Sequence, residues 1–306
     1  MRGTGMLICL LLLSACGQEQ AARPAAAGKA GGSTPPTIYA VSYPLAWAAG
    51  RLAGTDAEVR FPVPEGVDPA FWQPDLETIA AYQGADLILL NGAGYAKWIA
   101  NVSLSRNRLL NTSQGFAEQL IAIDAGPLHS HGPEGDHSHG ELAFTLWLDL
   151  TLYEKQVTAI AESLSRLLPD AADVIARRRE ALLLELRELH RELAAVGRQL
   201  EGAPLLYSHP VYQYLQRRYR LNGRALHWEP GEQPSDDEWA KLDALLAAHP
   251  ARIMLWEDEP LAKTREQLQR RGIDVVVFRP MGNRPSDGDF ATNLHADITN
   301  LAGAVR

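Results

Sequence analysis

The residues with the most evident chemistry lie in the segment HSHGPEGDHSHG, which runs from His129 to Gly140. Its candidate metal donors are four imidazoles and two carboxylates: His129, His131, Glu134, Asp136, His137 and His139. Neutral imidazoles are natural ligands of Zn²⁺ and Cu²⁺, and two H-S-H pairs on either side of a Gly-Pro hinge could fold around one ion. The glycines predict a loop that must be ordered on binding, which favours micromolar over nanomolar affinity. The alternative is a solvated loop with no metal-binding role.

Strands and helices alternate on both sides of this loop. In the first half, strands are predicted for Thr37 to Pro44, 57–63 and Ala85 to Gly92, with a helix closed by Gly54. In the second half, strands are predicted for Ala203 to His209, Ala251 to Glu257 and 273–280, with helices through Tyr219, from Asp236 to His249 and up to Arg271. This alternation predicts an α/β fold with two similar small lobes, each built on a parallel sheet.

One long helix is predicted between the lobes, from Asp170 to Leu200. No Pro or Gly interrupts this stretch before Gly197, and its apolar residues recur at helical spacing. A coiled coil is the alternative interpretation. A single helix of about 30 residues spans about 45 Å. We therefore expect one rigid helix that holds the lobes at a fixed distance, with a ligand cleft between them.

The amino terminus has the pattern of an export signal. A short apolar run, Met6 to Leu13, is followed by LSAC, which resembles a bacterial lipobox with Cys16 as the lipidated residue. An ordinary signal peptide is the alternative. The other cysteine, Cys9, lies in the segment to be removed, so no thiol pair would remain for a disulfide or a Cys-based zinc site. The expected location is extracytoplasmic, membrane-anchored, in the periplasm or at the cell surface.

The composition of the sequence indicates the parts of the chain and excludes some classes of partner. The expected parts are the signal peptide with its lipobox (1–16), a disordered Ala-, Gly- and Pro-rich tether (17–36), the first lobe with the His-rich loop at 129–139 (37–168), the linking helix (169–201) and the second lobe (202–306). A net charge of −8 argues against a nucleic-acid partner. None of the usual nucleotide-binding, hydrolase or zinc-protease motifs is present, so we expect a binding protein, most simply a monomer, and not an enzyme.

Five segments carry a more specific resemblance: EGVDPAFWQPDLETIAAYQGADLILLNGAGYAKWI, LWLDL directly after the His-rich loop, YSHPVYQYLQRRYRL, GEQPSDDEWAKLDALL and DVVVFRPMG. In order and spacing, from Thr37 to Arg306, the chain resembles the zinc and manganese solute-binding lipoproteins of bacterial ABC importers. The resemblance implies an ABC permease as partner, a lipid anchor in the membrane, and Zn²⁺ or Mn²⁺ held in the interlobe cleft by histidines and carboxylates.

The four ligand positions of that family fall on Ala70, Thr145, His209 and Arg279. Only His209 can bind a metal, because alanine has no donor, a threonine hydroxyl is a poor zinc ligand and arginine keeps its proton. A guanidinium about 5 Å from a divalent ion would be repelled by roughly 6 to 7 kcal/mol at an effective dielectric of about 20. We therefore expect Arg279 to replace the metal with an ion pair to Glu257. The alternatives are a His209 that is hydrogen-bonded without a ligand and a Glu257 that faces solvent.

Three functions remain open on this basis. The first is zinc delivery to a permease, by the loop together with a remodelled cleft that uses His209 and Glu257. The second is the same fold binding a non-metal solute or a metal complex, attracted by Arg279. The third is a zinc-buffering surface lipoprotein uncoupled from transport. Trp72, Trp98 and Trp147 are interpreted as core or cleft-wall packing, with an apolar ligand pocket lined by Phe71 and Trp72 as the alternative. The imidazoles without ligand spacing are interpreted as surface or packing residues: His190, His227, His249 and His295.

Overall fold

The computed structural model describes residues 34–123, 129–130, 136–137 and 142–305. Residues Pro35–Arg306 form one compact unit. The expected signal peptide, Cys16 and most of the expected tether lie outside the described residues. No helix in the described part of the chain is long and apolar enough to cross a membrane.

The first lobe contains a four-stranded parallel sheet in the order β2-β1-β3-β4. The register pairs Ile38 of the central β1 with Val59 on one side and Leu87 on the other. Its elements are β1 (Thr37–Ala40), α1 (Tyr43–Ala53), β2 (Glu58–Arg60), α2 (Leu76–Gly84), β3 (Leu87–Leu90), η1 (Lys97–Asn101), η2 (Arg106–Arg108), β4 (Leu109–Asn111), η3 (Gln114–Gln119), η5 (Leu146–Leu148) and α3 (Leu150–Leu167).

The second lobe repeats this plan. Its parallel sheet has the order β10-β9-β7-β8, so that in both lobes the first strand lies between the second and third strands along the chain. Its elements are β7 (Pro204–Tyr207), α5 (Gln213–Tyr219), β8 (Asn222–Ala225), α6 (Asp236–Ala248), β9 (Ile253–Trp256), α7 (Ala262–Arg270), β10 (Asp274–Val277) and α8 (Phe290–Ala304). The prediction of two similar α/β lobes is confirmed.

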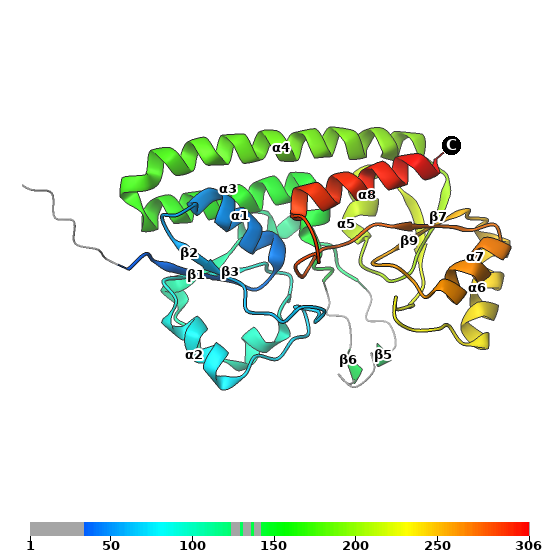
Figure 1. Cartoon of the computed structure of the whole chain (residues 1–306), viewed down its shortest axis with the longest axis horizontal. Helices are drawn as coiled ribbons and strands as arrows, with labels where there is room; N and C mark the ends of the chain where they lie inside the picture. Colours follow the sequence, from blue (N-terminus) through cyan, green and yellow to red (C-terminus); the bar gives the residue numbers. More distant parts are fainter. Residues whose placement is uncertain (1–33, 124–128, 131–135, 138–141, 306) are drawn as a thin grey trace, which may run out of the picture. The chain divides into compact units, whose positions relative to one another are not determined.

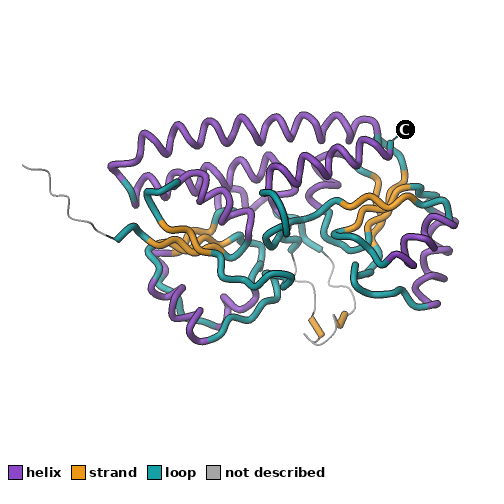
Figure 2. Tube along the Cα trace, viewed as in Figure 1, coloured by secondary structure: helices purple, strands orange, loops and turns teal. Residues whose placement is uncertain are grey.

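The long helix α4 (Ala172–Gln199) has 28 residues and is preceded by the short η6 (Pro169–Ala171). Figure 1 shows α4 running along one side of both sheets, with α3 and α8 beneath it, and Figure 2 shows the same helical layer against the two groups of strands. Ile175, Leu182 and Leu193 of α4 are among the residues that it buries at helical spacing. Because α4 packs on helices of this same chain, it is a linking helix and not a coiled-coil strand.

Most of the apolar core is shared by the two lobes. One cluster of buried side chains extends from Ile38 in the first sheet, through Leu186 of α4, to Leu205 and Phe278 in the second lobe. A smaller cluster beneath α6 and α7 belongs to the second lobe alone and is centred on Trp256. The lobes are therefore packed together along the helical layer, which fixes the walls of any cleft between them.

Side chains at the helix ends explain where several helices begin and end. Asp75, Asp149 and Asp289 accept backbone N–H groups in the first turns of α2, α3 and α8. Ser235 and a glutamate three residues later form a capping box at the start of α6. Gly54 closes α1 with φ 59°, a conformation that glycine adopts without strain.

Among the strands of the two parallel sheets, β4 and β8 were not predicted from the sequence pattern, and the helices α2, α3 and α8 were not predicted either. Each of the two strands has only three or four residues, and β8 contains the Asn222-Gly223 pair, which is typical of a turn. Gly223 is needed in β8 because a Cβ atom there would come 2.0 Å from Cζ of Tyr207 on the neighbouring strand. Close packing of the two strands explains the glycine.

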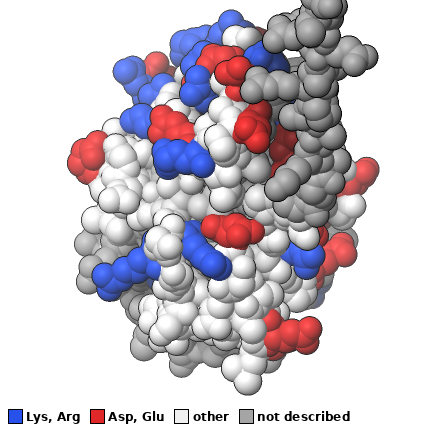
Figure 3. All heavy atoms as spheres, turned by 90° about the vertical axis from the view of Figure 1, so that its left-hand side faces the viewer, with Lys and Arg blue, Asp and Glu red and all other residues white. Residues whose placement is uncertain are grey.

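Basic and acidic side chains are mixed on the face shown in Figure 3, and no large patch of one sign covers it. Ion pairs between the first lobe and α4 include Arg51 with Glu185, at 2.7 Å, and Arg178 with Asp56, at 2.8 Å. Exposed pairs of this kind contribute little to stability, about 0–1 kcal/mol each.

Candidate functional site

A cleft with a volume of about 590 Å³ is lined by residues from both lobes. The first lobe contributes residues 65–69, Tyr95, Phe144, Thr145 and Trp147; the second contributes Val211, 229–230, 257–258, 279–287 and Asn293. Small-molecule sites typically occupy about 300–1,000 Å³, whereas a single water takes about 30 Å³. The cleft can therefore hold a hydrated ion or a larger solute.

Parallel strands bring the candidate residues of the second lobe to one edge of their sheet. Glu257 directly follows β9, and His209 and Arg279 lie in the loops that follow β7 and β10. Glu229 lies in the loop after β8. In open α/β sheets the carboxyl ends of the strands form the usual ligand-binding edge, and here that edge faces the cleft.

Three of the four positions predicted from the resemblance lie in or beside the cleft without offering a metal donor. Ala70 is fully buried and its backbone N–H donates to Oδ1 of Asp68, at 2.8 Å. Thr145 lines the cleft, but its hydroxyl donates to the carbonyl oxygen of Val211, at 2.5 Å. That contact joins the two lobes, so Thr145 has a structural role in the cleft wall.

Arg279 does not make the expected ion pair with Glu257. Its guanidinium Nη1 lies 2.7 Å from Oδ1 of Asp297, a fully buried residue of α8, and its Nε lies 3.9 Å from Asp258. The Arg279 backbone N–H also donates to Asp297, at 2.7 Å. The expectation was wrong because the α8 carboxylate was not visible as a neighbour in the sequence, and a buried carboxylate is a stronger partner for the guanidinium than a side chain on the adjacent strand.

Three carboxylates that line the cleft form an acidic group: Glu229 and Glu257 of the second lobe and Asp68 of the first. Oε1 of Glu229 lies 3.2 Å from Nδ1 of His209, which is 5% exposed. Burial raises the pKa of Glu257 well above its ordinary value, and Glu229 and Asp68 raise it further. Burial also raises the pKa of Glu229. A cation placed among these groups would lower the cost of ionising them, because it supplies the missing positive charge.

The His-rich loop is described only in part. The backbones of β5 (His129–Ser130) and β6 (Asp136–His137) pair antiparallel, with His129 opposite His137. His131, Glu134 and His139 lie outside the described residues. Within the described ranges, no three His, Cys, Asp or Glu side chains are arranged to hold a metal ion.

Comparison with known proteins places this fold and cleft in a family. The family model described as "Zinc-uptake complex component A periplasmic" matches residues 38–304. The chain belongs to this family. Its members are solute-binding components of uptake systems and not enzymes, which confirms the prediction of a binding protein.

Individual relatives share a low sequence identity with this chain. The zinc-binding lipoprotein AdcA of Streptococcus pneumoniae is 24% identical over 285 residues, which cover 90% of this chain and 54% of AdcA. The manganese-binding lipoprotein MntA of Halalkalibacterium halodurans is 27% identical over 184 residues, 58% of this chain and 56% of MntA. This chain thus spans about half the length of these relatives. The crystal structure of the metal-dependent lipoprotein YcdH from Bacillus subtilis has a TM-score of 0.75 at 18% identity and covers 88% of this chain and 99% of that chain.

Sequence reasoning missed three residues of the acidic group and its surroundings: Asp68, His227 and Glu229. The ring of His227 lies 5.6 Å from that of His209, although His227 shows no ligand spacing in the sequence. The usable signal was the segment HWE directly after β8, since β8 neighbours β7 and the ends of both strands reach the same edge. That signal was lost because β8 itself was not predicted.

Four of the residues that were predicted to pack or to lie on the surface do so. Trp98 and Trp147 are almost fully buried, and the indole N–H of Trp147 donates to Pro280 O, at 2.5 Å, across the cleft. His249 is buried against Leu205 O, at 3.0 Å, and His295 lies 2.8 Å from Glu192 on the surface. None of these four side chains belongs to the acidic group of the cleft.

Proposed function

We propose that this chain is the extracytoplasmic substrate-binding subunit of an ABC importer for a divalent metal, with zinc as its cargo. It captures the ion at the interlobe cleft, where His209 and Glu257 act together with imidazoles of the loop, His129, His131, His137 and His139, and delivers it to a permease. The names of AdcA and MntA, a zinc-binding and a manganese-binding lipoprotein, support a metal cargo.

The observation that carries the proposal is that Glu257, Glu229 and Asp68 all line the cleft, where burial and the two neighbouring carboxylates raise the pKa of Glu257. Glu257 and Glu229 are partly buried and Asp68 is exposed, and carboxylates that repel one another at such a site favour a proton or a cation among them. A histidine next to this group, His209, supplies a borderline-soft nitrogen donor 3.2 Å from Glu229. Mixed imidazole and carboxylate donors suit Zn²⁺, and the additional loop imidazoles favour Zn²⁺ over Mn²⁺, while Cu²⁺ would compete for the same nitrogens.

The anchor and the partners follow from the same proposal. Cys16 is the lipidated residue that holds the protein on the outer side of a membrane, and the protein works as a monomer that docks on its permease. The description of the family as a periplasmic component of a zinc-uptake complex supports the location and the permease partner, and the names of AdcA and MntA as lipoproteins support the anchor.

Zinc titration of untagged protein, from residue 17 onward, tests the proposal. We compare the wild type with Glu257→Gln, His209→Ala and a deletion of residues 129–139. If cleft and loop share one ion, each change should weaken the same binding event, by about tenfold or more for Glu257→Gln, which corresponds to about 1.4 kcal/mol. The combined variants should then lose less than the sum of the separate effects.

Glu162→Gln is the matched control, because Glu162 is an exposed glutamate on α3 outside the cleft. It should leave zinc binding unchanged. A wild-type zinc affinity that neither Glu257→Gln nor His209→Ala alters would remove the cleft from the proposal. An affinity that survives loop deletion would remove the loop.

A second function has its own support. Arg279 and Arg284 both line the cleft, and its volume of about 590 Å³ exceeds what one ion fills. Because six acidic side chains also line the cleft, these features favour a metal complex with an anionic chelator over a free anion. Titration with zinc alone and with zinc–citrate separates the two functions, because only the second predicts tighter binding of the complex and a loss of that preference in Arg284→Gln.

A further inference from the structure

A second cavity, with a volume of about 450 Å³, lies against β7, α5 and β8 and shares no lining residue with the cleft. One wall is formed by residues 121–123 of the first lobe, and the others by second-lobe residues between Tyr207 and Ala225. Its volume falls within the range of small-molecule sites. A ligand bound there would contact both lobes.

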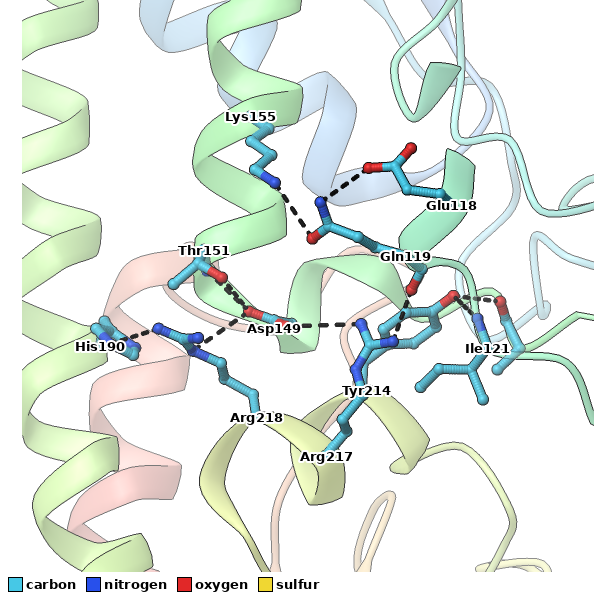
Figure 4. Close-up of polar contacts among 11 residues, drawn as sticks. Glu118, Gln119, Ile121, Asp149, Thr151, Lys155, His190, Tyr214, Arg217 and Arg218 are labelled. Atoms are coloured by element: carbon cyan, nitrogen blue, oxygen red, sulfur yellow. Dashed lines mark hydrogen bonds and ion pairs between the residues drawn. The ribbon is translucent and has the colours of Figure 1, made fainter. Parts of the chain in front are cut away.

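The wall contributed by the first lobe is held in place by hydrogen bonds, as Figure 4 shows. The hydroxyl of Tyr214 accepts the Ile121 N–H, at 3.1 Å, and donates to Ala143 O, also at 3.1 Å. Arg217 Nη1 donates to Gln119 O, at 2.6 Å. Because these contacts fix the wall before any ligand arrives, binding would require little ordering of the protein.

A buried hydroxyl lies in the opposite wall. Tyr207 lines the cavity and is 4% exposed, and its hydroxyl has no hydrogen-bond partner among the described residues. The ring is seated against Gly223, where a Cβ atom would lie 2.0 Å from Tyr207 Cζ. A buried donor without an acceptor is unfavourable, so a ligand oxygen that accepts this hydroxyl would be stabilised.

The charge of the lining selects an anion. No acidic side chain lines the cavity among the described residues, whereas Arg217 and Arg224 both do. The Arg224 side chain is exposed and makes no ion pair or hydrogen bond within the described part of the chain. Ile121, Ile123 and Pro210 give the rest of the wall an apolar character.

We propose that this cavity binds a small hydroxyaromatic carboxylic acid. The carboxylate pairs with Arg224, the flat ring system packs between Ile121 and Pro210, and the ring oxygen accepts a hydrogen bond from Tyr207. A guanidinium is well suited to a carboxylate, because it can donate two parallel hydrogen bonds. The site is independent of the metal proposed for the cleft.

Calorimetric titration with 6-hydroxy-2-naphthoate in excess chelator tests this site without metal. We expect saturable binding by the wild type, at least tenfold weaker binding by Arg224→Gln and about fivefold weaker binding by Tyr207→Phe. The thermal midpoint of Tyr207→Phe should not fall, because the lost hydroxyl has no protein partner. Arg252→Gln, an exposed arginine outside the cavity, is the matched control and should bind as the wild type does.

A comparison of ligands on the wild type keeps the test independent of any folding defect. 2-Naphthoate, which lacks the ring oxygen, should bind about fivefold more weakly than its hydroxylated form, and 6-hydroxy-2-naphthamide, which lacks the charge, at least tenfold more weakly. The proposal is overturned if the wild type shows no saturable binding in the millimolar range, if Arg224→Gln binds like the control, or if the three ligands bind equally.

Discussion

Replacing Arg279 with alanine should destabilise the protein without creating a zinc site. The sequence alone suggests that this guanidinium excludes a metal, and its removal would then chiefly change metal binding. In the structure its main partner is Asp297, which is fully buried in α8 at 2.7 Å. Arg279→Ala would leave that carboxylate with only the backbone N–H of residue 279 as a donor from this loop.

The expected loss is about 2 kcal/mol in the free energy of unfolding at pH 8. Removing one partner of a charged hydrogen bond costs about 1.5–3 kcal/mol, and breaking a fully buried ion pair costs about 3–5 kcal/mol. The lower range applies because the Arg279 side chain is 33% exposed and solvent screens its charge. Asp297→Asn should lessen the effect of Arg279→Ala, because an amide does not need the guanidinium as a counterion.

The pKa of Asp297 sets the direction in which the free energy of unfolding changes with pH. Burial raises the pKa of Asp297 from 3.8 to about 6, and Arg279 opposes that rise. A carboxyl whose pKa is raised by folding reduces stability as pH increases from its unfolded pKa to its folded pKa. In the wild type this decline should end near pH 6, whereas in Arg279→Ala it should continue to higher pH. The difference between the two proteins should therefore grow from pH 5 to pH 8.

Urea unfolding of the wild type, Arg279→Ala, Asp297→Asn and the double variant measures these quantities. Arg284→Ala is the control, because Arg284 also lines the cleft but donates to a backbone carbonyl, that of Phe61, at 2.7 Å. Equal stability of Arg279→Ala and the wild type at pH 8 would refute the assignment of Asp297 as the main partner. So would a gain of tight zinc binding without a loss of stability.

Three other outcomes are expected. Zinc binding should strengthen as pH rises above the ordinary range of a glutamate, because the ion must displace the proton held by Glu257. Calorimetry in buffers of different ionisation enthalpy measures the protons released on zinc binding, and Glu257→Gln should release fewer than the wild type. Deleting residues 129–139 should remove most zinc binding but leave the thermal midpoint in chelator within a few degrees of the wild type, since surface loops contribute little to the core. Cys16→Ser should move the protein from the membrane fraction to the soluble fraction; unchanged fractionation would contradict the lipobox interpretation.

The fold was largely predictable because its signals are local. Apolar runs such as the one that became β9 and the uninterrupted helical pattern of α4 do not depend on distant residues. The strands β4 and β8 were not predictable in the same way. They are short, and Gly223 in β8 resembles a turn residue until the ring of Tyr207 is known to lie against it. The contact between Gly223 and the ring of Tyr207, which the local sequence does not reveal, explains why this glycine lies in a strand.

The candidate site was predictable only in part, because ion pairs there join residues far apart in the chain. His209 and Glu257 were identified from strand ends or from the family resemblance. The pairing of Arg279 with Asp297 requires that α8 pack beside the end of β10, which no local pattern reveals. The role of Glu229 was hidden for a related reason, since it follows the unpredicted β8.

The shared core constrains how a solute can enter and leave the cleft. A rigid hinge motion of the lobes would have to disrupt the buried cluster along α3, α4 and α8, which contains residues of both lobes. The contacts across the cleft mouth are much smaller. Asn283 donates to the carbonyl oxygens of Pro64 and Val67, at 2.7 and 2.8 Å, and these hydrogen bonds lie partly in solvent. The 280–287 loop also accepts hydrogen bonds from the Trp147 indole at Pro280 O and from the Tyr43 N–H at Gly282 O, and its Arg284 donates to Phe61 O. Because these bonds together still cost less to break than a shared core, we expect a solute to exchange by local opening of this loop.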